Sequence, residues 1–297
     1  MKTVSIGRIT PMRLRIHHRT EYRYSHPVRE SENQLRLTPV SGRWQRCESS
    51  FISVLPATHL AHYPDLHGNT VHYFSLPEEH DYLVIDSRCT VITSESKVDY
   101  QNLPYGFLHK ELGDNLKHTG LHPYLNNSQF IEVTPAIWRE ALDIQDKSED
   151  VFETSYALMA FINENYQYLP GSTHVSTHAN EVITGKAGVC QDFAHAMISY
   201  CRALQIPARY VSGYFYDPTH DHHLKGSRTS HAWVEVYIKD YGWIGLDPTN
   251  LKVTDQTYVT TAIGRDYMDV APIIGTFRGH ARSSMDVSVT VEQLIAE

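Results

Sequence analysis

The chain has 297 residues, which exceeds the usual size of one domain, so we expect two domains or one domain with a large addition. Apolar residues make up 41% and charged residues 20%, a composition typical of a globular protein rather than of a disordered or fibrous one. The formal net charge of −8 disfavours a general nucleic-acid-binding protein, which needs a cationic surface. No segment approaches the roughly 18 apolar residues of a membrane-spanning helix, so no membrane partner is expected.

The first eight residues lack the apolar segment of a secretory signal peptide, and we therefore expect a cytoplasmic protein. Its four cysteines should then be free thiols, because that compartment is reducing. Cys190 and Cys201 lie on one predicted helix at a separation of about 16 Å, too far apart for a disulfide bond. Cys47 and Cys89 could meet in the N-terminal part, but the reducing compartment predicts thiols there too.

The first hundred residues are patterned as strands. Residues 12–24 alternate between two sets of side chains, one of them largely apolar and the other largely charged, which is typical of a half-buried β-strand. Shorter strand-like runs follow at 34–38, 50–56, 70–75, 82–86 and 89–93. Many short strands separated by turn residues predict a small β-sandwich-like domain, which we place at residues 1–102.

Positive charge is concentrated in this part of the chain. Residues 1–50 carry ten Lys or Arg and four acids, a balance of +6 that leaves −14 for the rest. These arginines could form an anion-binding or docking face. We favour the alternative that they pair with acids of the second domain, because exposed charge is the usual state of such residues.

The remainder of the chain is patterned as helices followed by strands. Residues 103–131 are rich in Pro, Asn and His and predict a linker with short helical turns. Helices are predicted from Pro135 after the N-cap Thr134, at 151–165, and from Val189 or Cys190 to Leu204. Strands are predicted at 209–215, 231–238, 242–247, 258–265 and 285–291. We therefore predict an α+β domain over residues 103–297, with helices packed on an antiparallel sheet.

One cysteine has the setting of a nucleophile. Cys190 follows a loop that contains Gly185 and Gly188, and it stands in the first turn of a predicted helix. Backbone N–H groups in that turn have no partners within the helix, and the helix dipole favours negative charge there. A thiolate, the nucleophilic form of cysteine, is favoured at such a position, and the same N–H groups can stabilise an oxyanion.

A base and an orienting carboxylate can be placed beside this cysteine. His231 begins one predicted strand and Asp247 ends the next, and the short segment 239–241 between the strands suits a hairpin. Such a hairpin brings Asp247 next to His231, so that Asp247 can orient the imidazole and His231 can take the proton of Cys190. Each residue alone is also common in a purely structural role: Cys190 as a small buried thiol, His231 as a core histidine, and Asp247 as the start of an Asp–Pro turn.

Four segments together resemble the transglutaminase-like superfamily of papain-fold cysteine enzymes, in particular its bacterial two-domain members with an N-terminal β-domain. They are Gly188–Ala194 (GVCQDFA), Ile206–Tyr214 (IPARYVSGY), Ser230–Val236 (SHAWVEV) and Gly242–Asn250 (GWIGLDPTN). The resemblance is strong over residues 150–275 and looser over 12–93. The chain lacks a recognisable EF-hand loop, so calcium activation is not expected.

The resemblance implies Cys190 as nucleophile, His231 as base and Asp247 as the residue that orients it. It further implies a side-chain oxyanion donor upstream of the cysteine, for which Tyr166 is the first candidate, followed by Tyr168 and Gln191. The expected activity is that of a cysteine hydrolase or acyl transferase, which opens an amide or peptide bond of a peptide or protein substrate through an acyl-enzyme thioester, without a cofactor. Hydrolysis, deamidation and transamidation all remain open, as does the oligomeric state.

Two other classes of function remain. A non-catalytic peptide- or protein-binding module would use the papain-like scaffold alone, and a metal-dependent hydrolase would be inhibited by chelators rather than by alkylating agents. The histidine-rich runs at 220–223 and 59–67 invite a metal interpretation, but neither has recognisable ligand spacing. We therefore expect no metal site.

Overall fold

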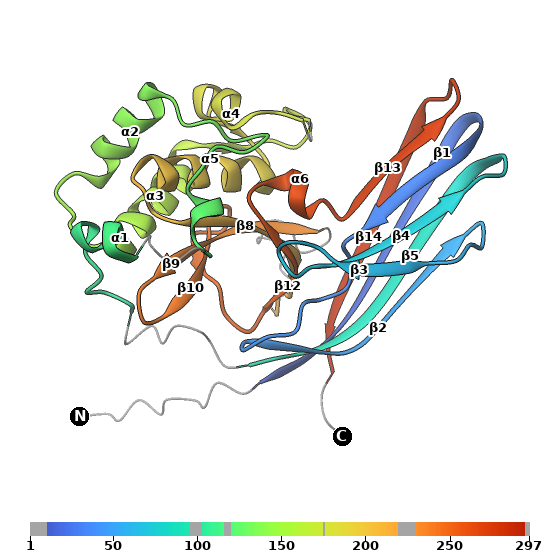
Figure 1. Cartoon of the computed structure of the whole chain (residues 1–297), viewed down its shortest axis with the longest axis horizontal. Helices are drawn as coiled ribbons and strands as arrows, with labels where there is room; N and C mark the ends of the chain where they lie inside the picture. Colours follow the sequence, from blue (N-terminus) through green and yellow to red (C-terminus); the bar gives the residue numbers. More distant parts are fainter. Residues whose placement is uncertain (1–10, 95–102, 116–119, 175, 219–229, 295–297) are drawn as a thin grey trace.

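The computed structural model describes residues 11–94, 103–115, 120–174, 176–218 and 230–294. It has two parts: a β-domain formed by strands β1–β5 together with β13 and β14, and an α+β domain formed by the elements between them (Figure 1). The fold class predicted from the sequence is therefore confirmed. Within the described residues, no helix is long and apolar enough to cross a membrane.

The β-domain is organised around one long strand. β1 (Met12–Leu35) pairs through its first half with β5 and β14, and through its second half with β4 and β13. The other strands of this domain are β2 (Gln45–Leu55), β3 (Ala61–Pro64), β4 (Thr70–Leu76), β5 (His80–Thr93), β13 (Ile273–Arg278) and β14 (Ser283–Gln293). The runs predicted at 82–86 and 89–93 are thus one continuous strand, and the alternation detected at 12–24 is half of β1.

The assignment of residues 285–291 to the sheet of the second domain is wrong. These residues belong to β14, which pairs with β1 of the β-domain from Leu14↔Gln293 to Tyr24↔Ser283. Figure 1 shows the last two strands beside β1, so the first and the last strands share one sheet. A period-two pattern indicates that a strand has one buried face, but it does not indicate which sheet that strand joins. The predicted domain 103–297 therefore loses its last two strands to the β-domain.

The expected pairing of the N-terminal arginines with the second domain is also wrong. Their ion pairs among the described residues are made within the β-domain, with acids of its own strands and turns. These pairs include Arg13–Glu48 (2.6 Å), Arg19–Glu21 (2.7 Å), Arg36–Asp65 (3.5 Å) and Arg46–Glu48 (3.3 Å).

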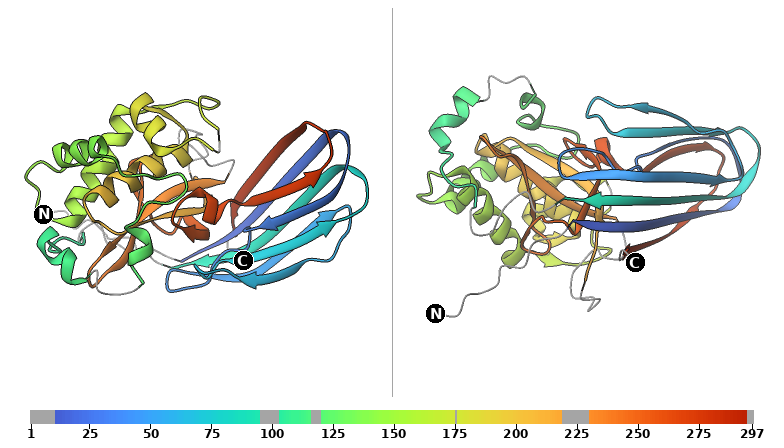
Figure 2. Two further views of the ribbon diagram at one scale, coloured as in Figure 1. Left: turned by 45° about the horizontal axis from the view of Figure 1, so that its top comes forward. Right: turned by 90° about the horizontal axis from the view of Figure 1, so that it is seen from below.

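The α+β domain places its main helices against an antiparallel sheet whose strand order is β11-β10-β9-β8-β12 (Figure 2). Its helices are α1 (His109–Asn115), η1 (His122–Tyr124), α2 (Pro135–Gln145), α3 (Val151–Asn165), α4 (Ala179–Gly185), α5 (Cys190–Ala203) and α6 (Tyr267–Val270). Its strands are β6 (Gln167–Tyr168), β7 (Ala187–Gly188), β8 (Ala208–Phe215), β9 (His231–Ile238), β10 (Gly242–Asp247), β11 (Lys252–Val253) and β12 (Tyr258–Gly264). The predicted bounds of α3, β9 and β10 are confirmed to the residue.

Local sequence explains where the helices begin. The Thr134 side chain accepts a hydrogen bond from Ile137 N at the start of α2, and Asp150 accepts one from Glu153 N at the start of α3. Both are N-cap side chains that satisfy backbone donors left free in a first helical turn. Helix α5 is buried along nearly its whole length and forms the centre of the apolar core between the other helices and the sheet.

The two domains share a buried interface. Leu14 and Val289 of the β-domain form one apolar cluster with Tyr214 and Val259 of the five-stranded sheet. Beside it, His18 Nδ1 and the Tyr214 hydroxyl lie 2.8 Å apart and are buried. Burial lowers the pKa of His18 to about 4, so this imidazole is neutral at neutral pH.

Candidate active site

Cys190 is the first residue of α5, as the sequence predicts, and its side chain is half-buried. The turn that carries it is fixed by Asp192, whose Oδ2 accepts hydrogen bonds from Val189 N (2.8 Å) and from Thr173 Oγ1 (2.6 Å). Asp192 is 1% exposed, and this burial raises the pKa of its carboxyl group. The carboxylate thus closes the turn just before the thiol and fixes the direction in which Cys190 leaves the helix.

Gly188 is required by the close approach of this carboxylate. A Cβ atom at position 188 would lie 2.6 Å from Oδ2 of Asp192, closer than real Cβ contacts allow. Glycine is therefore needed at position 188 because the Asp192 side chain lies so close, and not because the backbone angles there exclude other residues. The loop before it turns at Lys186, which has a left-handed backbone conformation (φ 48°).

His231 and Asp247 meet as the hairpin argument predicts. Strands β9 and β10 are antiparallel neighbours, and His231 Nε2 lies 2.8 Å from Asp247 Oδ2. Both side chains are completely buried. The ring of His231 is surrounded by the aromatic rings of Phe215, Trp233 and Tyr258, with centroids 6.1–6.3 Å away.

The other nitrogen of His231 is available to the thiol. Nδ1 is buried and has no hydrogen-bond partner within the described part of the chain. Burial alone would lower the pKa of His231, but the Asp247 carboxylate and then the Cys190 side chain, which acts on the same ring, raise this pKa to about 10. The imidazole is therefore a cation at neutral pH, paired with the Asp247 carboxylate.

Asp247 is held by donors on both of its oxygens. Oδ1 accepts from Thr249 N (2.9 Å) and Asn250 N (3.2 Å), whereas Oδ2 accepts from Asn250 Nδ2 (2.9 Å) and the Tyr258 hydroxyl (2.8 Å) in addition to His231. Burial favours the neutral acid, but His231 and these hydrogen bonds lower the pKa of Asp247 below its ordinary value. The carboxylate thus stays ionised in a fully buried position.

Tyr166, the first candidate for the oxyanion donor, is engaged elsewhere. Its hydroxyl lies 3.0 Å from that of Tyr200, which donates to Glu140 Oε2 at 2.6 Å. Tyr168, the second candidate, lies on β6 opposite Gly188, and burial followed by the charge of Cys190 raises its pKa to about 12.

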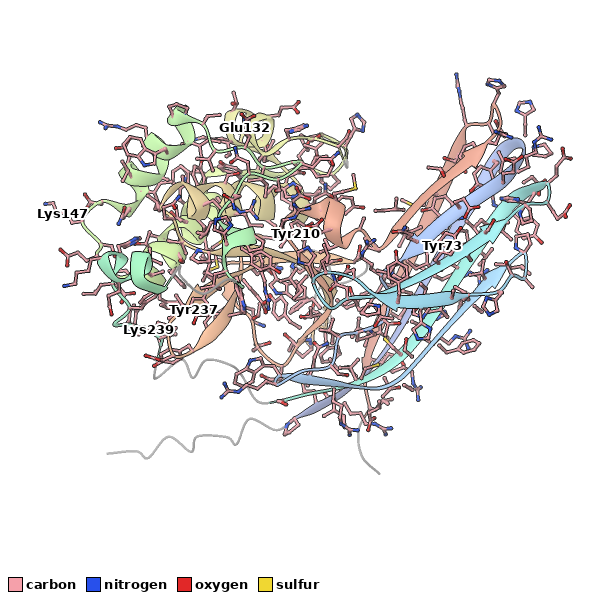
Figure 3. All side chains as sticks on the ribbon, viewed as in Figure 1. Tyr73, Glu132, Lys147, Tyr210, Tyr237 and Lys239 are labelled. Carbon is pink, nitrogen blue, oxygen red and sulfur yellow. The ribbon has the colours of Figure 1, made fainter. Side chains whose placement is uncertain are left out.

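Two further tyrosines lie close enough to respond to the same sulfur. Burial and then the charge of Cys190 raise the pKa of Tyr210 well above its ordinary value, and the same two causes raise the pKa of Tyr267. Figure 3 shows Tyr210 beside α6, on the side of the α+β domain that faces the β-domain. Tyr168, Tyr210 and Tyr267 therefore lie within electrostatic range of Cys190.

Three residues of this site had no role assigned from the sequence. Asp192 stands two residues after Cys190, where a carboxylate in a first helical turn is a detectable signal. Asn250 follows Asp247-Pro248, a pattern that predicts a side-chain-stabilised turn. Tyr258 gave no sequence signal, because only the folded sheet brings its strand to Asp247.

Metal binding finds no support in the described ranges, where no group of three or more His, Cys, Asp or Glu residues could hold an ion. Of the histidine-rich runs, residues 220–223 lie outside the described residues. His67 bonds the Tyr124 hydroxyl (2.9 Å) and lies 3.2 Å from Asp269 Oδ2. All four cysteines are free thiols, as predicted.

The fold and this thiol-centred site define a papain-like protein, and comparison with known proteins gives its family. Residues 141–248 match the transglutaminase-like superfamily, and residues 14–92 match the bacterial transglutaminase-like N-terminal region. The chain belongs to the transglutaminase-like superfamily. Cys190, His231 and Asp247 all lie inside the first matched segment.

Two individual proteins and one solved structure are also similar to this chain. An uncharacterized protein of Mycobacterium tuberculosis is 34% identical over 296 residues, covering 94% of this chain and 92% of the relative. A protein-glutamine gamma-glutamyltransferase of Pseudomonas aeruginosa is 33% identical over 97 residues, which cover 31% of this chain and 14% of that protein. A solved structure from Cytophaga hutchinsonii, described as a candidate cysteine protease, has a TM-score of 0.78 and 26% identity, covering 97% of this chain and 92% of its own.

Proposed function

We propose that this protein is a cysteine-dependent enzyme that opens amide or peptide bonds through an acyl-enzyme thioester. The observation that carries the proposal is the buried His231, whose Nε2 bonds Asp247 and whose unpartnered Nδ1 is left for Cys190 at the start of α5. An imidazolium beside a sulfur stabilises the thiolate, which is the attacking species. The Cytophaga hutchinsonii structure described as a candidate cysteine protease and the Pseudomonas aeruginosa glutamyltransferase support the same chemical class.

The reaction follows from this arrangement. The Cys190 thiolate attacks the carbonyl carbon of an amide, and the oxyanion that forms is stabilised by N–H groups at the start of α5, with Tyr168 rather than Tyr166 as the side-chain candidate. The C–N bond then breaks as His231 gives its proton to the leaving nitrogen, which leaves a thioester. Water or a second amine attacks the thioester and passes a proton to His231, and the C–S bond breaks to release the Cys190 thiolate beside the imidazolium. Asp247 keeps the imidazole oriented throughout.

Selective alkylation tests this proposal without knowledge of the substrate. Iodoacetamide should label Cys190 rapidly near pH 6, where an ordinary thiol is almost entirely protonated. Peptide mass spectrometry separates Cys190 from Cys47, the half-exposed thiol whose pKa burial raises and which serves as an internal control. Rapid labelling should vanish in Cys190→Ala. Labelling of Cys190 no faster than that of Cys47 would refute the proposal.

The acyl acceptor can be assigned by a second measurement. A glutamine-containing peptide library incubated with the protein should yield free acid, from water, or an amine adduct when a primary amine is added. Both products must disappear in Cys190→Ala. We expect hydrolysis to predominate, and exclusive adduct formation would make the protein a transamidase instead.

A further inference from the structure

Strand β12 is the edge of the five-stranded sheet, because it pairs with β8 on one side only. The open edge of such a strand carries backbone N–H and C=O groups that need partners. Here the partners come from the β-domain, which approaches the edge with two side-chain amides, Gln45 and Asn69, and with Val40 N, which donates to Thr260 O (3.1 Å).

Each amide forms the pair of bonds that a neighbouring strand would form. Gln45 Nε2 donates to Thr260 O and Gln45 Oε1 accepts from Thr260 N, both at 2.8 Å. Asn69 makes the equivalent two bonds, also at 2.8 Å, to O and N of Ile263. Both amides are buried, and each is anchored in its own domain by one further bond, Gln45 to Val40 O and Asn69 to Asp65.

Tyr258 begins the same strand, two residues before Thr260. Its hydroxyl donates to Asp247 Oδ2, the oxygen that also binds His231. The ring is 6% exposed and packs against Phe215 and Trp233 with centroids 4.8 and 5.2 Å away, so the hydroxyl cannot move independently of the strand. A shift of β12 therefore also shifts the Tyr258 hydroxyl that binds the Asp247 carboxylate.

We propose that Tyr258 is a positioning residue that aims Asp247 at His231, and that the β-domain holds it in place through the Gln45–Thr260 clamp. The inference rests on the proposed function and gives the β-domain a task in it. A carboxylate turns easily about its last side-chain bond, so a donor fixed on Oδ2 restricts that rotation. Gln45 acts on the strand, and Tyr258 acts on Asp247.

The test measures the iodoacetamide labelling rate of Cys190 from pH 5 to 11 in the full-length chain. Tyr258→Phe removes only the hydroxyl, and the rate at pH 6 should fall at least about tenfold, as expected for the loss of one hydrogen bond to a charged carboxylate. The alkaline inflection, at which His231 loses its proton, should move to lower pH because a less well aimed Asp247 raises the His231 pKa less. An inflection at the wild-type position would overturn the proposal. Failure of the wild-type protein to label selectively would instead refute the proposed function.

The clamp itself is tested with a matched pair of variants. Gln45→Met and Asn69→Leu each remove two hydrogen bonds to β12. Gln45 binds Thr260, two residues from Tyr258, whereas Asn69 binds Ile263, five residues from Tyr258. Both variants should lower the thermal midpoint, and only Gln45→Met should shift the alkaline inflection. The double variant Gln45→Met/Tyr258→Phe should shift it no further than Tyr258→Phe alone, since both changes act through one hydroxyl. Equal shifts in Gln45→Met and Asn69→Leu, or additive shifts in the double variant, would contradict a specific clamp.

Discussion

A charged imidazole inside the protein links His231 to the stability of the whole fold. Its pKa is about 10 in the folded state and 6.5 in an unfolded chain, because Asp247 outweighs the effect of burial. A raised folded-state pKa contributes stability that is complete below pH 6.5 and is lost as the pH rises toward 10. Asp247, with a lowered pKa, contributes in the opposite direction, and its share is lost in acid.

Because protonation of His231 is coupled to folding, the free energy of unfolding should depend on pH differently in the wild-type protein and in His231→Gln. Between pH 7 and pH 9, the free energy of unfolding of the wild type should fall relative to that of the variant, at a rate approaching about 1.4 kcal/mol per pH unit. Urea unfolding at four pH values measures this difference, and the variant cancels the titration of the other groups. Parallel pH profiles for the two proteins would show that His231 is not held as a cation.

At the level of single elements, the start of α5 is sensitive to added side-chain volume. Gly188→Ala places a methyl group 2.6 Å from Asp192 Oδ2. We expect a loss of about 2 kcal/mol in the free energy of unfolding, typical of overpacking, together with slower labelling of Cys190.

Gly185→Ala is the control for this change. Gly185 lies at the end of α4, and a Cβ atom there meets nothing within 4 Å. Its effect on the free energy of unfolding should stay within about 0.5 kcal/mol or be stabilising. If the two variants unfold at the same urea concentration, the Asp192 cap does not depend on the missing side chain at position 188.

The elements themselves were largely predictable because each depends on local signals. Helix α3 begins at the N-cap Asp150, and the 239–241 hairpin already placed Asp247 beside His231. The position of β14 was not predictable, since alternation at 285–291 fits any sheet with a free edge. Tyr258 was missed for the same reason, because its contact with Asp247 depends on which strands become neighbours.

For the molecule as a whole, the C-terminal strand joins two regions that the sequence suggested were separate. Val289 on β14 is 5% exposed and packs in the cluster that also contains Tyr214 and Val259 of the α+β domain. The two domains therefore share part of their core, and a substitution that destabilises the β-domain should also destabilise the α+β domain. Independent unfolding of the two halves would require this cluster to be exposed to water.

Val289→Ala tests whether the molecule unfolds as one unit. Removing two buried methyl groups should cost about 2 kcal/mol and lower the thermal midpoint by roughly 4 °C. Three of the four tryptophans, Trp138, Trp233 and Trp243, lie in the α+β domain, so fluorescence reports mainly on that half, whereas far-ultraviolet circular dichroism reports on both. Both signals should shift together in Val289→Ala, and neither should shift in Ser288→Ala, whose side chain is exposed on the same strand. If the fluorescence midpoint stays at the wild-type value while the dichroism midpoint falls, the β-domain unfolds separately from the α+β domain. In that case the hydrogen bonds from Gln45 to Thr260 would be too weak to control the position of Tyr258.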